Sequence, residues 1–119
     1  MPVLEIAEDN IPANTQELDV INGERASQID MHVRAAAITL FAVASAVGLT
    51  HSLYVGSRNP LNTSVVSVSA TPNQIIENEN MVVSGVVGTR GEIVRLYVNE
   101  TAGAATNDYR ARVVITEMR

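Results

Sequence analysis

The chain has 119 residues and contains no cysteine, no tryptophan and no lysine, and its aromatic residues are three tyrosines and one phenylalanine. The absence of cysteine excludes disulfides, thiol catalysis and thiolate metal sites, and it leaves the redox compartment open. The absence of lysine excludes a phosphate-loop lysine, a Schiff base and a lysine general base. With 3% aromatic residues, the chain has too few rings to form a platform for stacked bases.

The charge balance is acidic. The formal net charge is −5 and the isoelectric point is about 4.9, and all 8 basic residues are arginine. A protein that binds nucleic acid through its phosphates needs a basic surface, so we predict no nucleic-acid partner. The length allows at most one ordinary domain with an appendage.

The most informative stretch is 35–57, which contains no charged residue and is bracketed by Arg34 and Arg58. An uncharged run of this length is typical of one helix that crosses a bilayer. We predict a long helix over 15–57, whose membrane-spanning part is 35–57. The alternative is a helix buried inside a large soluble assembly.

The ends of this helix have sequence signals of their own. Asn14 followed by Glu17 is typical of a capped first turn, and Ser27 is a second candidate cap. The helix is therefore expected to begin at residue 15 or at about residue 24. Gly56 fits the position after its last turn, and Pro60 prevents its continuation.

Small and amphipathic residues suggest roles along the helix. Ala37, Ala44 and Gly48 are predicted to be helix-packing residues, because small residues four apart allow helices to approach closely in lipid. The alternative is that alanine is present only as a good helix former. We predict membrane-interface positions, where polar residues meet lipid headgroups, for a set at the two ends of the run: Arg34, His51, Tyr54 and Arg58.

After Pro60 the apolar residues recur with period two, which predicts strands. Four are expected, at 63–70, 80–87, 92–99 and 109–117, as an antiparallel meander with a hairpin turn at 89–91. The fold class predicted is α+β: one long hydrophobic helix followed by a small antiparallel four-stranded β-domain over 58–119. Residues 1–14 are predicted to be an extended acidic arm, and the alternative there is a disordered terminus.

A single sheet of four strands would leave one apolar face uncovered. The expected face includes residues from three of the four strands: Val66, Val68, Val94, Leu96, Val98, Val113 and Ile115. A stable sheet needs a second layer, and the remaining chain offers little to supply it. We therefore expect another chain to cover this face.

No group of residues in the sequence is typical of catalysis, a cofactor or a metal. His32 and His51 would lie roughly 28 Å apart along a helix, too far to share a metal. Gly85, Gly88 and Gly91 span a strand end and a turn, with no helix after them, so they are predicted to be turn glycines rather than a phosphate loop. We predict no catalytic, cofactor-binding or metal-binding residue.

Two segments resemble known families. The residues Arg34-Ala35-Ala36-Ala37 are similar to the processing site of archaeal pilins and archaellins, and the following AAITLFAVASAVG resembles their packed helix. That resemblance implies a filament subunit with hydrophobic helices in its core. The piece from Ser67 to Asn99 looks like part of an immunoglobulin-like adhesive module, which implies an immunoglobulin-like β-domain.

Together these patterns predict a non-enzymatic structural protein. We expect a single-pass membrane anchor that links a membrane to a protein shell or larger complex, as a minor protein of a membrane-containing virion or an accessory subunit of an envelope complex. The alternative is the pilin- or archaellin-like filament subunit. Its expected partners are membrane lipid and other protein subunits, in a homo-oligomer or a larger assembly. Its expected location is a virion membrane or cell envelope, with the β-domain on the outer side.

Overall fold

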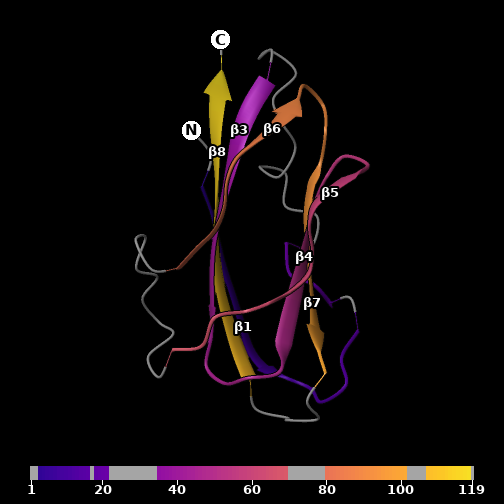
Figure 1. The fold of residues 1–119 in the computed structure, drawn as a ribbon, viewed down its shortest axis with the longest axis vertical. Coiled ribbons are helices and arrows are strands. Elements are labelled where there is room, and N and C mark those ends of the chain that lie inside the picture. Colours follow the sequence, from indigo (N-terminus) through magenta and orange to yellow (C-terminus); the bar gives the residue numbers. More distant parts are fainter. Residues whose placement is uncertain (1–2, 17, 22–34, 70–79, 102–106, 119) are drawn as a thin grey trace.

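The computed structural model describes residues 3–16, 18–21, 35–69, 80–101 and 107–118, and within these ranges the fold is all-β (Figure 1). Two antiparallel sheets of four strands each face one another. Sheet A has the order β1-β8-β3-β6, and sheet B has the order β2-β7-β4-β5. The strands are β1 Val3–Ile11, β2 Leu18–Asp19, β3 Ala35–Ala44, β4 Leu49–Val55, β5 Arg58–Val65, β6 Met81–Thr89, β7 Val94–Glu100 and β8 Asn107–Met118.

The pairing follows a simple rule. β1 pairs with β8, β2 with β7, β3 with β6 and β4 with β5, all antiparallel. The chain thus forms one long hairpin whose tip is the β4–β5 turn. Two further ladders, β3 with β8 and β4 with β7, join the four pairs into two sheets. Eight strands interleaved in this order in two sheets form a jelly roll.

The core lies between the two sheets and is built by period-two alternation. On β7 the buried side chains are Val94, Leu96 and Val98, and on β8 every second residue from Tyr109 to Ile115 is buried. The strands beside them also contribute to the core: β3, next to β8, contributes Ile38 and Leu40, and β4, next to β7, contributes other apolar residues. Burying an aliphatic side chain of this size contributes about 1.5–3 kcal/mol, so this layer is the main stabilising element of the sandwich.

The long hydrophobic helix predicted over 15–57 is wrong where the structure describes its membrane-spanning part, 35–57, and with it the α+β fold class; residues 17 and 22–34 lie outside the described part. The uncharged run 35–57 forms β3, a turn over 45–48, and then β4. Both strands lie inside their sheets, between two neighbours. On β3, Phe41 and Val43 on the outer face are buried as well as Ile38 and Leu40 on the inner face. A strand covered on both faces, as β3 is over 40–44, has a continuous apolar sequence. Followed by the uncharged β4, it looks like one membrane helix.

The membrane-spanning helix predicted over 35–57 is not found. Within the described part of the chain, no helix has the length and apolar content needed to span a bilayer. The helix-packing role predicted for Ala37, Ala44 and Gly48 is therefore wrong, because they lie in β3 and in the turn after it. Arg34 lies outside the described residues. Location in a virion membrane or a cell envelope stays a prediction.

The four-stranded meander is also wrong, although strands were predicted close to their observed places. The turn at 89–91 does join β6 to β7, but these strands belong to different sheets and do not pair. The predicted apolar face is likewise divided: Val94, Leu96 and Val98 lie in sheet B and face Val113 and Ile115 in sheet A. The cover expected from another chain comes from this chain itself, because β1 to β4 complete both sheets.

Candidate functional site

Each sheet of this sandwich has two edge strands, and an edge is where another chain could pair. In sheet A the edges are β1 and β6, and in sheet B they are β2 and β5. Natural edges are usually protected by charge, proline, bulges or short length. A comparison of the four edges therefore identifies the strand that is most open to a partner.

The β1 edge is protected by charge. Glu5 and Asp9 are exposed, and both carboxylates form ion pairs with arginines of the adjacent β8. Glu5 Oε1 lies 2.6 Å from Arg112 Nε, and Asp9 Oδ1 lies 2.7 Å from Arg110 Nη2. A second copy of this edge would bring like charges together, which disfavours pairing between two β1 strands.

Both edges of sheet B are protected by backbone features. β2 consists of two residues, Leu18 and Asp19, so it offers almost no edge. β5 contains Pro60, which has no N–H to donate, and Thr63, whose φ of 48° departs from extended geometry. Its pairing with β4 is also interrupted by two register shifts. Neither strand is a good template for a partner.

The β6 edge lacks most of these protections. Its nine residues, MVVSGVVGT, include no charge and no proline. Met81 and Val87 are 50% and 46% exposed. Among the described residues, β6 pairs with β3 alone, and its other side ends sheet A. A long, apolar, uncharged edge of this kind is a site where a partner strand is expected to add.

The geometry of β6 divides it into two parts. Two register shifts interrupt its pairing with β3, and Gly85 between the parts has a φ of 71°. The second part, 86–89, pairs regularly with 35–38 of β3. Bulges bend and twist an edge, so this regular part is the better template for a partner strand.

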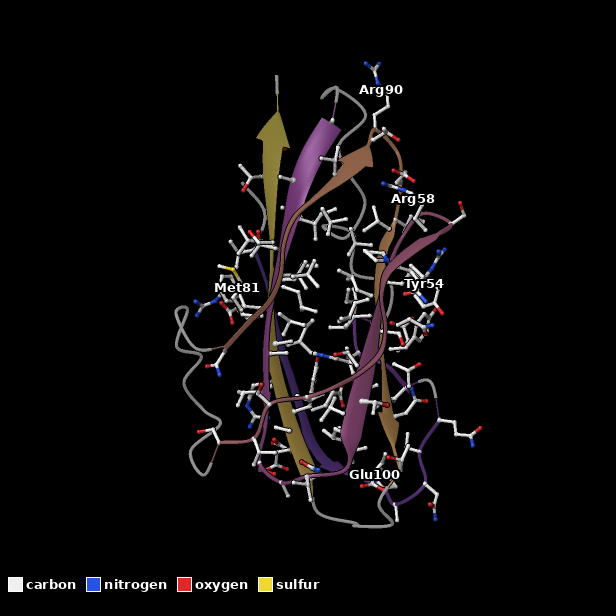
Figure 2. All side chains as sticks on the ribbon, in the orientation of Figure 1. Tyr54, Arg58, Met81, Arg90 and Glu100 are labelled. Carbon is white, nitrogen blue, oxygen red and sulfur yellow. The ribbon has the colours of Figure 1, made fainter. Side chains whose placement is uncertain are left out.

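The outer face of sheet A beside this edge is apolar. By register, Glu5, Arg112, Phe41 and Met81 form one row across β1, β8, β3 and β6. The row passes from charged residues at the β1 end to apolar ones at the β6 end, where Phe41 is 5% exposed. Figure 2 shows Met81 on the side of sheet A that faces away from sheet B. The β6 edge therefore combines backbone groups that pair with no described strand with two exposed apolar side chains, those of Met81 and Val87.

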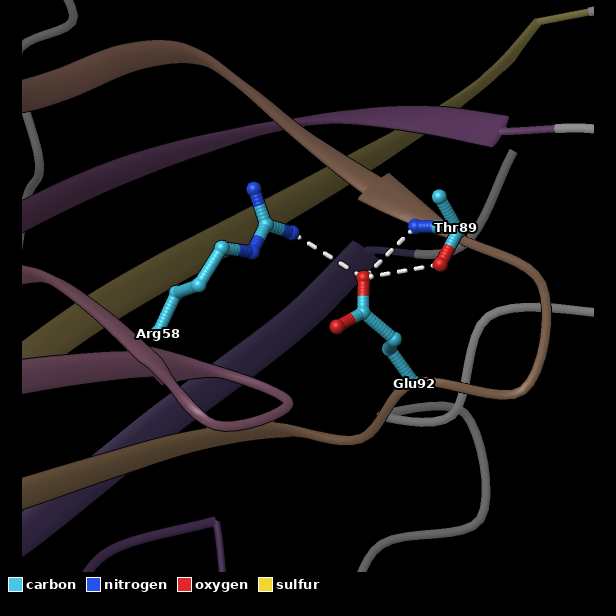
Figure 3. Close-up of polar contacts among 3 residues, drawn as sticks. All are labelled: Arg58, Thr89 and Glu92. Carbon is cyan, nitrogen blue, oxygen red and sulfur yellow. Dashed lines mark hydrogen bonds and ion pairs between the residues drawn. The ribbon is translucent and has the colours of Figure 1, made fainter.

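A polar cluster holds the end of β6 in place (Figure 3). Glu92 Oε1 accepts hydrogen bonds from Thr89 N at 2.7 Å, from Thr89 Oγ1 at 3.1 Å and from Arg58 Nη2 at 3.0 Å. The hydrogen bond from the Thr89 backbone, followed by the Thr89 hydroxyl and the Arg58 charge, keeps the pKa of Glu92 below its ordinary value. The cluster joins the β6–β7 turn to the start of β5, so the end of the open edge has a defined position.

The residues predicted from the sequence as site residues do not form one site. Ala37 lies on the outer face of β3, opposite Val87 of β6, and among the described members of the set it is the one beside the β6 edge. Ala44 is buried at the end of β3, and the carbonyl of Gly48 accepts a hydrogen bond from Thr101 N at 2.9 Å. His51 is buried between the sheets, and Arg58 pairs with Glu92.

Tyr54 lies on the outer face of sheet B, where its ring contacts that of Tyr97 (Figure 2). The membrane-interface role predicted for His51, Tyr54 and Arg58 stays a prediction. Sequence reasoning missed Met81 and Val87 as surface residues, although both lie in the strand that the sequence predicted over 80–87. Within the described ranges no cluster of acidic or histidine side chains could hold a metal ion.

Comparisons with known proteins add no relative to this description. No protein-family model, curated protein or solved structure matches the chain. The class of protein is thus given by its architecture: within the described residues it is a small jelly-roll β-sandwich, whose β6 edge has neither charge nor proline.

Proposed function

We propose that this chain is a non-enzymatic structural subunit that pairs with a second copy of itself through β6 and so contributes to a larger protein assembly. The β6 edge is the observation that carries the proposal, because the other three edges are protected by charge, shortness or proline. Jelly rolls serve as shell subunits in viral capsids, and that analogy of fold alone suggests a capsid or envelope-associated shell as the setting.

Charge favours a second copy as the partner. An antiparallel pair of β6 strands brings no charged side chains together, because the strand has none. Such a pair is symmetric, so the same residues are used on both copies and the interface closes as a dimer. It would join two A sheets into one sheet of eight strands, with a β1 strand at each end.

The distance between the acidic edges also favours this arrangement. Seven strand spacings of about 4.8 Å separate the two β1 strands in the joined sheet, or roughly 34 Å. The Debye length at physiological salt is about 8 Å, so repulsion across that distance is screened. The net charge of −5 on each copy therefore opposes this dimer only weakly.

A filament with hydrophobic helices in its core is not proposed, because the segment that would form those helices forms β3 and β4. Growth of an open-ended polymer would require one edge of the sandwich to pair with a different edge of the next copy. The symmetric β6 interface predicts a closed dimer as the basic unit, and the rest of an assembly would then use other surfaces.

The test compares two matched valines on opposite edges of sheet A. Val87 on β6 is 46% exposed, and Val3 on β1 is 44% exposed. The full chain, Val87→Lys and Val3→Lys would be examined by sedimentation equilibrium over a range of concentrations. We expect a dimer for the full chain and for Val3→Lys, and a monomer for Val87→Lys, because a lysine on the edge would face its symmetric copy.

Circular dichroism would check that both variants remain folded. A full chain that stays monomeric at high micromolar concentration would refute the proposal. The same holds if Val3→Lys dissociates the dimer and Val87→Lys does not. Growth into open polymers that Val87→Lys fails to stop would place the interface elsewhere.

A further inference from the structure

The outer face of sheet B carries a second kind of surface. Side chains alternate along β4 and β7, so Thr50, Ser52 and Tyr54 point away from the core, as do Arg95, Tyr97 and Asn99. The register places Thr50 opposite Asn99, Ser52 opposite Tyr97 and Tyr54 opposite Arg95. Two of the three tyrosines in the chain therefore lie side by side on one outer face.

The tyrosine rings are in contact. Their centroids are 5.6 Å apart and their planes are inclined at 79°. Both residues are partly exposed. A partly exposed tyrosine offers an apolar ring together with a hydroxyl that can donate or accept a hydrogen bond. The pair is thus an amphipathic contact surface at the centre of sheet B, and Figure 2 shows Tyr54 on the side away from sheet A.

Beside this pair lies a polar hollow of about 450 Å³. Three amides and three hydroxyls line it: Asn14, Gln16, Asn99, Thr50, Thr63 and Thr101. Asn99 is the next outward residue after Tyr97 on β7, so the hollow begins roughly 7 Å from the ring pair. Thr50 is one of the lining residues, and its buried Oγ1 has no hydrogen-bond partner among the described residues.

The rim of the hollow is held in a strained backbone conformation. Asn14 and Thr63 have φ values of 60° and 48°, and they are the non-glycine residues with positive φ in the described part of the chain. Asparagine adopts this region readily, whereas it is strained for a β-branched residue such as Thr63, and strained residues cluster at ligand sites. Thr63 is held by its N–H, which donates to Ser52 Oγ at 2.9 Å.

Glu100 anchors the other side of the rim. Its side chain is almost fully buried, at 2% exposure, and completes the lining. Its backbone N–H donates to the carbonyl of Thr15 at 2.8 Å, and its Oε1 accepts from Asn14 N at 3.5 Å. One buried carboxylate does not supply the several oxygen ligands with negative charge that a divalent cation requires. Apart from this almost fully buried carboxylate, the side chains that line the hollow are uncharged amides and hydroxyls.

We propose that the hollow and the adjoining Tyr54–Tyr97 pair form a binding site for a neutral oligosaccharide. Sugar hydroxyls both donate and accept hydrogen bonds, which matches the amides and hydroxyls of the lining. The C–H faces of sugar rings are apolar and pack on aromatic side chains. From Thr50 to Tyr54 the surface extends roughly 13 Å along β4, enough for a short chain of sugars rather than one ring.

The test titrates the full-length protein with neutral linear tetrasaccharides of glucose, mannose, galactose, xylose and N-acetylglucosamine. Isothermal titration calorimetry would measure affinity, and amide and aromatic NMR shifts would locate the contact. We expect at least one of the five to bind and to shift the signals of Thr50, Tyr97 and Asn99. If none binds at millimolar ligand, or if the shifts lie elsewhere, the proposal is overturned.

Matched variants sharpen the result. Tyr97→Ala should weaken binding about tenfold or more, because it removes the ring surface. Thr50→Val removes a hydroxyl at nearly constant volume and should weaken binding severalfold, while Thr39→Val, on the outer face of sheet A, should leave affinity unchanged. Equal affinities in all three variants would overturn the site even if a sugar binds.

This site is independent of the proposed assembly through β6. Val87→Lys should bind the same tetrasaccharide with unchanged affinity, whether or not it is monomeric. If Tyr97→Ala does not fold, the NMR shifts of the unmodified protein decide the question alone, since they report the position of the ligand directly.

Discussion

His51 on β4 and Tyr109 on β8 join the two sheets through the core: His51 Nδ1 lies 3.0 Å from Tyr109 Oη. Both residues are fully buried, and their rings meet edge to face at 87°. A polar link in an otherwise apolar layer ties sheet A to sheet B at one defined register, because any relative shift of the sheets would leave both groups without a partner.

Burial makes this link sensitive to acid. Desolvation lowers the pKa of His51 from 6.5 to about 4, because the charged imidazolium is disfavoured in the core. The unfolded chain binds a proton at higher pH than the folded one, so the stability contributed by neutral His51 is present above pH 6.5 and is lost as the pH falls toward 4. The loss should reach about 2 kcal/mol by pH 5 and about 3 kcal/mol by pH 4.

Denaturant titrations between pH 7 and pH 4 would measure this loss, with His51→Gln as the non-titrating control. The variant should show a flatter profile between pH 6.5 and pH 5. The lowered pKa of Glu92 also reduces the stability of the fold as the pH falls, but only below its ordinary value of 4.5. It therefore does not affect the profile between pH 6.5 and pH 5. Parallel profiles for the two proteins would contradict the prediction.

Tyr109→Phe should destabilise the fold by about 1–3 kcal/mol, because it leaves His51 Nδ1 buried without its partner. Tyr54→Phe removes a hydroxyl from the protein surface and should change stability by less than about 0.5 kcal/mol. Chemical denaturation at pH 7 measures both free energies of unfolding. Equal effects would mean that the core hydrogen bond contributes no more than a surface hydroxyl.

Asn107 is another buried polar residue, and its substitution should destabilise the fold. Its Nδ2 donates to the carbonyls of Ala46 at 2.9 Å and Val47 at 3.1 Å, and its Oδ1 accepts from Ala46 N at 3.2 Å. These bonds hold the β3–β4 turn against the start of β8. Asn107→Ala should therefore cost about 1–3 kcal/mol.

The control for this prediction is Asn62→Ala, at an exposed position on β5, which should have little effect. Thermal unfolding of the two variants beside the unmodified protein gives the comparison. A midpoint for Asn107→Ala no lower than that of Asn62→Ala would contradict the assigned role of Asn107.

Substituting two glycines with positive φ separates the cost of backbone strain from the cost of a steric clash. Gly56 and Gly85 have φ values of 62° and 71°, so alanine at either position should cost about 1 kcal/mol of conformational strain. A Cβ at Gly56 would also meet the carboxylate of Glu92, whereas a Cβ at Gly85 meets nothing within 4 Å. Gly56→Ala should thus lower the unfolding midpoint more than Gly85→Ala, and the reverse order would contradict the cluster around Glu92.

The strands of the C-terminal half could be predicted from the sequence because their outer faces are polar or exposed. The strands expected at 80–87, 92–99 and 109–117 correspond to β6, β7 and β8 within a few residues. Their inward residues were also correct, as Val94, Leu96 and Val98 are buried. Period-two alternation survives where one face of a strand meets water, and β7 and β8 keep it, whereas β6 was recognised by its valines and its bounding turn.

The strands of the N-terminal half could not be predicted in this way. β3 and β4 lie inside their sheets, and β3 is buried on both faces, so the alternation is absent there. Single-sequence periodicity does not separate such strands from an apolar helix, and the alanines of β3 favoured the helix. Of the candidate surface, the lack of charge on β6 was visible in advance, but its place at a sheet edge was not.

What the sequence by itself determined is local: the alternation of β7 and β8, the neutrality of β6, the acidity of β1, and a chain without cysteine or lysine chemistry. Only the tertiary structure decided which strands pair, because the partners are remote in the chain. Arg112 and Glu5, 107 positions apart, form an ion pair across β8 and β1. Local propensity acts over a few residues, whereas the jelly roll is selected by burying all the apolar faces at once.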